Sequence, residues 1–135
     1  LRAERPLWAV MSSVYERGGS AVARYSPTPG RDRFGSYRDR GQLASLPSMI
    51  FSADLARSVG AWDPRIEAGQ DTDFVLRIAR AAEQACCWPD LEVRIDVSPR
   101  PRITSSAVPQ LRGKARMLVK HWRTFTWRRR LYYVA

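Results

Sequence analysis

The sequence has two cysteines, a single histidine and no acidic residue after Asp96. Cys86 and Cys87 are adjacent, and because neighbouring cysteines rarely bridge each other, neither a disulfide framework nor a zinc site is expected. Two small buried side chains in a reducing compartment are the simpler interpretation. His121 has no Cys, Asp or Glu near it in the sequence and is interpreted as structural. No apolar run approaches the length of a transmembrane helix, and no signal peptide is visible.

The net charge of +10 is unevenly distributed along the 135 residues. Residues 1–96 contain 13 basic and 13 acidic residues and sum to zero, whereas residues 97–135 contain 10 basic residues and no acid. A neutral body with a cationic tail implies a polyanionic partner, either lipid headgroups or nucleic acid. The length allows one domain with a buried core. The chain begins at Leu1 rather than Met, which predicts a start inside a longer protein.

Apolar periodicity predicts a chain of the α/β class with short elements. Residues 26–45 are rich in Pro, Gly, Ser, Arg and Asp, which predicts a long surface loop. The other predicted elements are a β-hairpin from 7–15 and 20–25, a buried strand at 48–51, a helix at 53–59 stopped by Gly60, a helix capped by Asp71 and running to about Gln84, and a half-buried strand at 92–97.

A last helix is predicted from about Ser106, and its apolar residues recur at gaps of 4, 3, 4 and 3, as one helix face requires. The residues of this stripe are Leu111, Ala115, Leu118, Trp122 and Phe125. Basic residues lie beside or opposite the stripe, so the helix could lie on an anionic membrane surface. The alternative is that the stripe packs on the body of the protein.

The stretch from Val59 to Ile78 carries the most chemical information. A Gly turn leads to the pair Trp62-Asp63, and after a short loop two carboxylates open an apolar helix. Asp71 therefore falls at a loop-to-helix junction, where a carboxylate can face a cleft and accept a proton from a sugar hydroxyl. An Asp at such a junction is also an ordinary helix cap, and the two roles are compatible. Trp62 and Asp63 fit either a sugar platform with a carboxylate or a core Trp and a turn Asp.

This stretch resembles the acceptor-side motif of family 2 glycosyltransferases, in which Gly-Gly-Phe-Asp-Glu precedes Glu-Asp-Xaa-Asp-Leu and an apolar run containing Leu-Arg-Leu. Gln70 stands where Glu is commoner. The resemblance, which extends from residue 1 to about 125, implies that Asp71 is the catalytic base of an inverting sugar transfer. It implies an acceptor site formed by Trp62, Asp63, Gln70 and Asp73. The alternative for Asp73 is a first-turn residue that the helix dipole favours. The partners would be a nucleotide-sugar donor and a hydroxyl acceptor.

The resemblance also implies a fold: the C-terminal half of a Rossmann-like nucleotide-sugar transferase domain of the A type, with a mixed sheet. Residues 1–105 would form this half, and residues 106–135 a basic amphipathic helical tail. The nucleotide-binding half, with its metal-binding Asp-Xaa-Asp, would precede Leu1, so the chain alone is expected to be inactive. That half would hold most of the coordination of a divalent Mg or Mn ion. No metal ligand is assigned in this chain, because Ser98 stands where many members have a ligating His.

The implied role is polysaccharide or glycolipid synthesis in the cytoplasm, with the tail holding the enzyme at the inner face of the membrane. Two alternatives stay open. A small basic nucleic-acid-binding module would explain the charge, but it leaves the stretch from Trp62 to Ile78 unexplained, and no nucleic-acid-binding motif is present. A non-catalytic remnant with a transferase-like fold is the other alternative.

Overall fold

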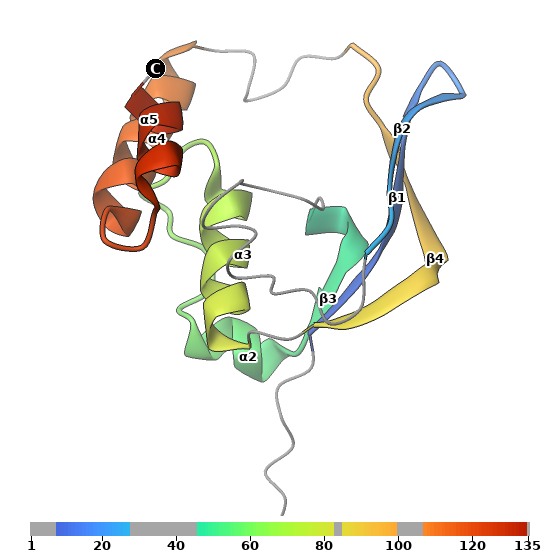
Figure 1. Ribbon diagram of the computed structural model, residues 1–135, viewed down its shortest axis with the longest axis horizontal. Helices are drawn as coiled ribbons and strands as arrows, with labels where there is room; N and C mark the ends of the chain where they lie inside the picture. The colour runs from blue at the N-terminus through green and yellow to red at the C-terminus, as the bar shows by residue number, and fades with distance from the viewer. Residues whose placement is uncertain (1–7, 28–45, 83–84, 100–106, 135) are drawn as a thin grey trace, which may run out of the picture.

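The centre of the fold is strand β1 (Trp8–Arg17), which pairs with every other strand of a four-stranded sheet. The computed structural model describes residues 8–27, 46–82, 85–99 and 107–134. Strand β2 (Ser20–Tyr25) pairs antiparallel with the second half of β1, and β3 (Met49–Phe51) pairs antiparallel with its first half. Strand β4 (Cys86–Asp96) runs parallel to β1 along the opposite edge (Figure 1). The sheet is therefore mixed.

The hairpin forms as the sequence predicted, because two glycines suit its turn. Gly18 and Gly19 both have positive φ angles, of 58° and 82°, as a two-residue turn of the I′ type requires. Strand β4 is longer than predicted and begins at Cys86 rather than near Glu92. Its pairing with β1 shifts register between Met11 and Ser12, where the three residues after Trp88 have no partner in β1. This bulge accommodates Pro89, which cannot donate to a sheet.

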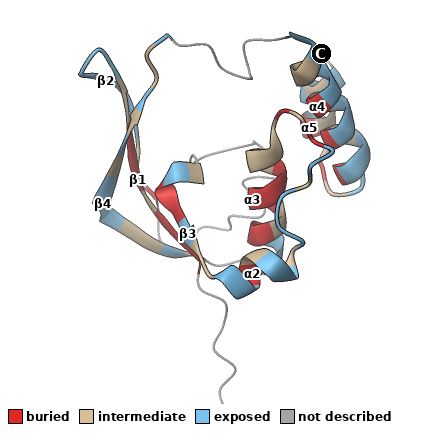
Figure 2. Ribbon diagram, turned by 180° about the vertical axis from the view of Figure 1, so that it is seen from behind, coloured by how far each residue is buried: buried red, intermediate tan, exposed pale blue. Residues whose placement is uncertain are grey.

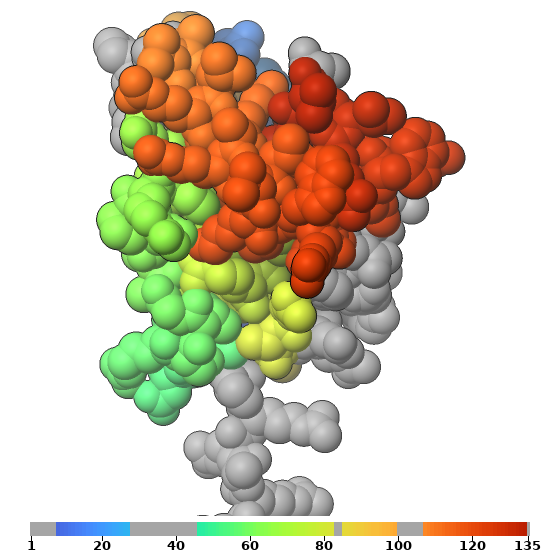
Figure 3. All heavy atoms as spheres, turned by 90° about the vertical axis from the view of Figure 1, so that its left-hand side faces the viewer, coloured from blue at the N-terminus to red at the C-terminus, as the bar shows by residue number. Residues whose placement is uncertain are grey.

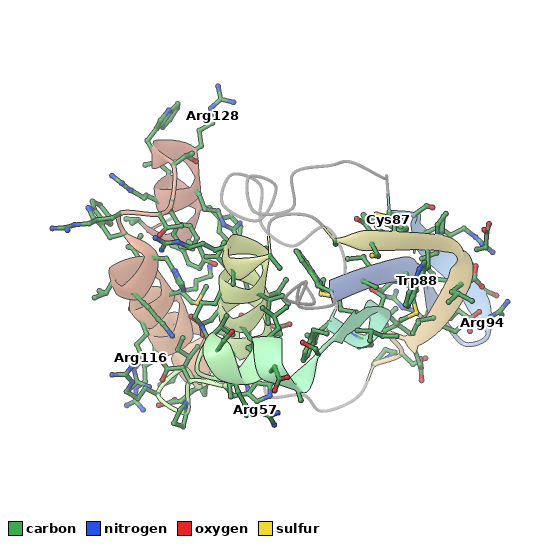
Figure 4. All side chains as sticks on the ribbon, turned by 90° about the horizontal axis from the view of Figure 1, so that it is seen from below. Arg57, Cys87, Trp88, Arg94, Arg116 and Arg128 are labelled. Carbon is green, nitrogen blue, oxygen red and sulfur yellow. The ribbon has the colours of Figure 1, made fainter. Side chains whose placement is uncertain are left out.

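The helices form two layers on one side of the sheet. A 3₁₀ turn (η1, Leu46–Ser48) leads into β3, and α2 (Ala53–Ser58) begins after Ser52, whose hydroxyl accepts from the Leu55 N–H at 3.1 Å. Helix α3 (Gln70–Ala81) lies between the sheet and the pair formed by α4 (Ala107–His121) and α5 (Trp127–Val134) (Figures 1 and 4). The α/β class is thus confirmed. The transferase fold itself stays a prediction.

Helix α3 forms the middle of the hydrophobic core (Figure 2). The apolar face predicted for it is confirmed: Phe74, Val75, Ile78 and Ala79 are buried, and Ala82 packs against the core. Leu76 is also buried, because the helix has the sheet on one side and α4 on the other. The rest of the core comes from every layer, with Trp8, Val10, Met49, Leu55, Ile66, Met117 and Phe125.

Two local predictions are wrong. Helix α3 is capped by Gly69 and not by Asp71, which lies in the first turn, and the helix ends at Ala81. Gly69 has a φ of 83°, which a side chain would disfavour. The cysteines are not buried: Cys86 is exposed and Cys87 is partly exposed, because β4 is an edge strand in which no residue is fully buried. The predicted loop at 26–45 lies almost entirely outside the described residues. Residue 84, the predicted end of helix α3, also lies outside them.

The orientation of α4 bears on the two alternatives left open for its apolar stripe, since a different face of the helix packs on the body. The buried residues of α4 are Gly113, Met117 and His121. Leu111 is 70% exposed and Trp122 is 49% exposed, so most of the predicted stripe points outward, and only Phe125 beyond the helix is buried. Close packing explains this rotation, since a Cβ on Gly113 would lie 2.1 Å from the carbonyl oxygen of Ala68.

Candidate functional site at the start of helix α3

The turn that carries Trp62 and Asp63 is fixed to α3 by Arg77. The Arg77 guanidinium donates to the carbonyl oxygens of Val59 and Ala61, the latter at 2.6 Å. It also contacts the Asp73 Oδ2 atom, at 3.0 Å from Nε and 2.6 Å from a terminal nitrogen. The turn itself needs unusual backbone angles, with φ of 82° at Gly60 and 50° at Ala61. One arginine on a rigid helix therefore holds the position of this loop.

Trp62 is at once a packing residue and a surface residue. Its ring lies 4.5 Å from the Phe74 ring, at an interplanar angle of 32°. It is nevertheless 45% exposed, so the side chain adds an aromatic surface that solvent can reach. The two interpretations left open by the sequence, core residue or sugar platform, are thus both compatible with its position.

Asp63 connects the loop to α4. Its Oδ1 atom accepts from the backbone N–H and the Nε of Arg65, at 3.1 and 3.0 Å, and its Oδ2 atom accepts from Lys120 Nζ at 2.7 Å. Hydrogen bonds from Arg65 and then Lys120 hold the pKa of Asp63 well below its usual range. The carboxylate is therefore ionised at neutral pH, and it is already occupied by two cations.

Asp73 is fully buried and lies among three basic side chains. Its Oδ1 atom lies 2.7 Å from His121 Nε2 and 2.9 Å from Lys120 Nζ, and its Oδ2 atom contacts Arg77. Burial raises the pKa of Asp73, but hydrogen bonds from His121, Arg77 and Lys120 outweigh it and hold that pKa below the usual range. An ionised carboxylate only accepts, so the proton in the His121 contact is on Nε2.

Two adjoining pockets flank Asp63 and Ile66. The first has a volume of about 390 Å³ and is lined by Trp62, Asp63, Pro64, Ile66, Glu67 and Gln70. The second has a volume of about 460 Å³ and is lined by Asp63, Arg65, Ile66, Ala115, Arg116, Val119 and Lys120. Glu67 also lies 3.4 Å from Arg116, so the loop is tied to α4 at this point as well. Both volumes are within the range of small-molecule sites.

Asp71 follows Gln70, which lines the first pocket, but Asp71 itself lines neither pocket. It is half-buried, and its Oδ1 atom accepts from the Thr72 N–H at 2.7 Å. Burial is the main cause that raises the pKa of Tyr133, and the negative charge of Asp71 adds to that rise. Asp71 therefore lies within electrostatic range of α5.

The structure thus gathers three of the five predicted site residues around one pocket: Trp62, Asp63 and Gln70. Asp71 lies one residue further along α3. Asp73 is completely buried, which argues against direct contact with an acceptor and for a positioning role. The contact between His121 and Asp73 was missed, because the two residues are 48 positions apart. The spacing of four residues from Gly113 to Met117 to His121 places the three on one helix face, but it does not identify a partner for that face.

Comparison with family models, with curated proteins and with solved structures gives no match for this chain. In the described part of the chain, no group of three or more His, Cys, Asp or Glu side chains is placed to hold a metal ion. The predicted metal of an intact enzyme therefore stays a prediction. None of the described helices is both long and apolar enough to cross a lipid bilayer.

Proposed function

We propose that this chain is the acceptor side of an inverting glycosyltransferase, which passes a sugar from a nucleotide-sugar donor to a hydroxyl group. The observation that carries the proposal is the pocket at the start of α3. An exposed Trp62 ring, the Asp63 carboxylate and the Gln70 amide border one hollow, and the carboxylate of Asp71 follows directly in the chain. Aromatic faces with nearby hydrogen-bonding side chains suit a sugar, which has apolar faces and polar edges.

Asp71 supplies the base in this proposal. The acceptor oxygen bonds to the anomeric carbon while the bond from that carbon to the diphosphate oxygen breaks, and Asp71 takes the hydroxyl proton. A nucleoside diphosphate leaves. A divalent ion, when bound, would offset the charge of that leaving group, and no described residue of this chain is assigned to hold it.

The remaining charged residues position the pocket and do not touch the acceptor. Asp73 orients Arg77, and Arg77 holds the two carbonyl groups on either side of Gly60. Lys120 joins Asp63 to Asp73 from the side of α4. The pocket is therefore bordered by a loop that is attached to two helices, and a site held in this way loses little entropy on binding.

The first test is sugar binding by the 135-residue chain, measured by saturation-transfer NMR with a panel of mono- and disaccharides. The expected result is saturation transfer that Trp62→Ala abolishes. The matched control is Trp127→Ala, which removes an exposed Trp from α5, away from the pocket. Transfer that persists in Trp62→Ala and is lost in Trp127→Ala would exclude this pocket as the acceptor site.

The second test is turnover by this chain together with the nucleotide-binding half that the proposal requires, with labelled nucleotide sugars as donors. Asp71→Asn keeps the shape of the side chain but removes the base, so turnover should fall by roughly 10²- to 10⁴-fold. Asp54→Asn makes the same change in the first turn of α2 and should leave turnover unaltered. Near-normal turnover of Asp71→Asn would exclude the assignment, and sugar binding without any turnover in the wild type would favour the non-catalytic alternative.

A further inference from the structure

Helix α4 has two apolar faces, and only one of them is buried. Gly113, Met117 and His121 face the body. The opposite side of the helix carries a second series that points to solvent: Val108, Leu111, Ala115, Val119 and Trp122. Val119 is 80% exposed and Leu111 is 70% exposed, and exposed apolar side chains that adjoin one another on one face mark an interaction surface. The outward face of α4 is therefore as apolar as its inward face.

Helix α5 extends this surface. Trp127, Leu131 and Val134 recur at helical spacing, and all three are more than half exposed. The Arg130 guanidinium lies 4.4 Å from the Trp122 ring, so the apolar series of the two helices adjoin. Figure 3 looks onto this face, where α4 and α5 cover most of the upper half of the molecule. We call this surface the outer face of α4 and α5.

The charge on this part of the chain has one sign. Residues 107–134 contain eight Lys or Arg and no Asp or Glu. Lys120, Arg116 and Arg112 are engaged by acidic residues of the loop, and Arg129 is buried against Tyr133. Four other basic residues have no acidic partner in the described part of the chain: Lys114, Arg123, Arg128 and Arg130. In Figure 4 the Arg128 side chain points away from the body.

We propose that the outer face of α4 and α5 docks on an anionic lipid bilayer. Two tryptophans and a set of aliphatic side chains, flanked by cations, fit the boundary between headgroups and acyl chains. Nucleic acid would satisfy the cations, but it offers no hydrocarbon in which Leu111, Val119 and Leu131 could be buried. A second copy of this face would bring the same positive charges together, because the face carries no acid.

Docking in this orientation would bring the larger pocket to the edge of the bilayer. Ala115 and Val119 belong both to the outer face and to the lining of the 460 Å³ pocket. That pocket also has Arg116 and Lys120 on its border, and it meets the proposed acceptor pocket at Asp63 and Ile66. An acceptor attached to a lipid could therefore reach the pocket without leaving the surface. The docking proposal does not depend on the sugar transfer.

The test is flotation of the 135-residue chain with phosphatidylglycerol vesicles and with phosphatidylcholine vesicles, at low and high salt. Binding to the anionic vesicles is expected to be salt-sensitive, and neutral vesicles should bind at least about tenfold more weakly. The double substitution Leu111→Asp with Val119→Asp should weaken binding by at least about tenfold, since it removes two exposed apolar groups that the bilayer would bury. Arg123→Gln with Arg128→Gln should weaken it by roughly tenfold as well.

The control is Val22→Asp, which adds one negative charge, against two in the double variant, at an apolar residue that is 54% exposed on β2, at the far end of the molecule (Figure 1). It should bind vesicles like the wild type, and so should Asp71→Asn, which separates docking from the proposed reaction. The substituted positions are exposed except for the half-buried Asp71, and thermal melts would check that each variant folds. Equal binding to both kinds of vesicle, or no binding to either, would overturn the proposal. So would tight binding of RNA or DNA that vesicles do not displace, or self-association of the protein that Leu111→Asp abolishes.

Discussion

Replacing Asp73 with Asn should strongly destabilise the protein, although the two side chains have nearly the same shape. Both oxygens of Asp73 accept from basic groups: His121 and Lys120 on one side, and Arg77 on the other. An Asn has one accepting oxygen and one donating NH₂ group. Whichever way the amide turns, its NH₂ group faces a donor that is already protonated. Breaking a buried ion pair from one side costs about 3–5 kcal/mol.

That loss is large compared with the total stability of a domain, which is about 5–15 kcal/mol. Urea unfolding at pH 7, followed by circular dichroism, would measure it. The control is Asp54→Asn, which removes the same charge from a side chain that is 91% exposed and pairs with Arg57 at 2.7 Å. Surface pairs of this kind contribute about 0–1 kcal/mol. The reasoning would be refuted if Asp73→Asn lost no more stability than Asp54→Asn.

Three further predictions follow from the same contacts. Gly113→Ala should destabilise the fold, because the new Cβ would lie 2.1 Å from a backbone oxygen. Overpacking costs about 1–3 kcal/mol, here near the upper end of that range, whereas the gain in helix propensity is about 1 kcal/mol. Urea unfolding measures the difference, and the control Ala115→Gly on the exposed side of α4 should show only the propensity loss. The pKa of Asp73 is depressed in the folded state, so the stability that this carboxylate contributes is complete above the unfolded pKa of about 3.9 and is lost as the pH falls below that value. The free energy of unfolding, measured as a function of pH, should show this loss in the wild type and a smaller one in Asp73→Asn. In urea unfolding, Trp62→Ala should lower the free energy of unfolding by roughly 1–2 kcal/mol and Trp8→Ala by about 3–5 kcal/mol, because Trp62 is 45% exposed and Trp8 only 1%. Equal losses would contradict the packing described.

The elements were predictable where the signal is local. The hairpin, α2 and α3 follow from glycines and from apolar spacing within a few residues, and each forms close to its predicted place. Strand β4 was predicted too short, because Pro89 interrupts a pattern that the structure continues through a bulge. The burial of Cys86 was predicted wrongly, because the sequence does not reveal that β4 is at the edge of the sheet.

The candidate site was predictable only in part, for a related reason. Trp62, Asp63 and Gln70 are close in sequence, so a motif could indicate that they share a pocket. The partners of Asp63 and Asp73 on α4 are 57 and 48 residues away, and no local pattern encodes such contacts. Asp73 was therefore predicted to contact the acceptor, whereas its burial among basic groups indicates a positioning role.

The rotation of α4 connects these observations. On apolar burial alone the stripe with Leu111, Val119 and Trp122 would turn inward, since each such side chain gains about 1.5–3 kcal/mol when buried. The opposite face is nevertheless inside, and in this rotation His121 and Lys120 reach the buried Asp73, which would otherwise keep only Arg77 of its own helix as a partner. Gly113 permits the close approach that the rotation requires. The carboxylate that fixes the pocket therefore also turns the apolar stripe outward, so loss of Asp73 should impair both acceptor binding and vesicle docking.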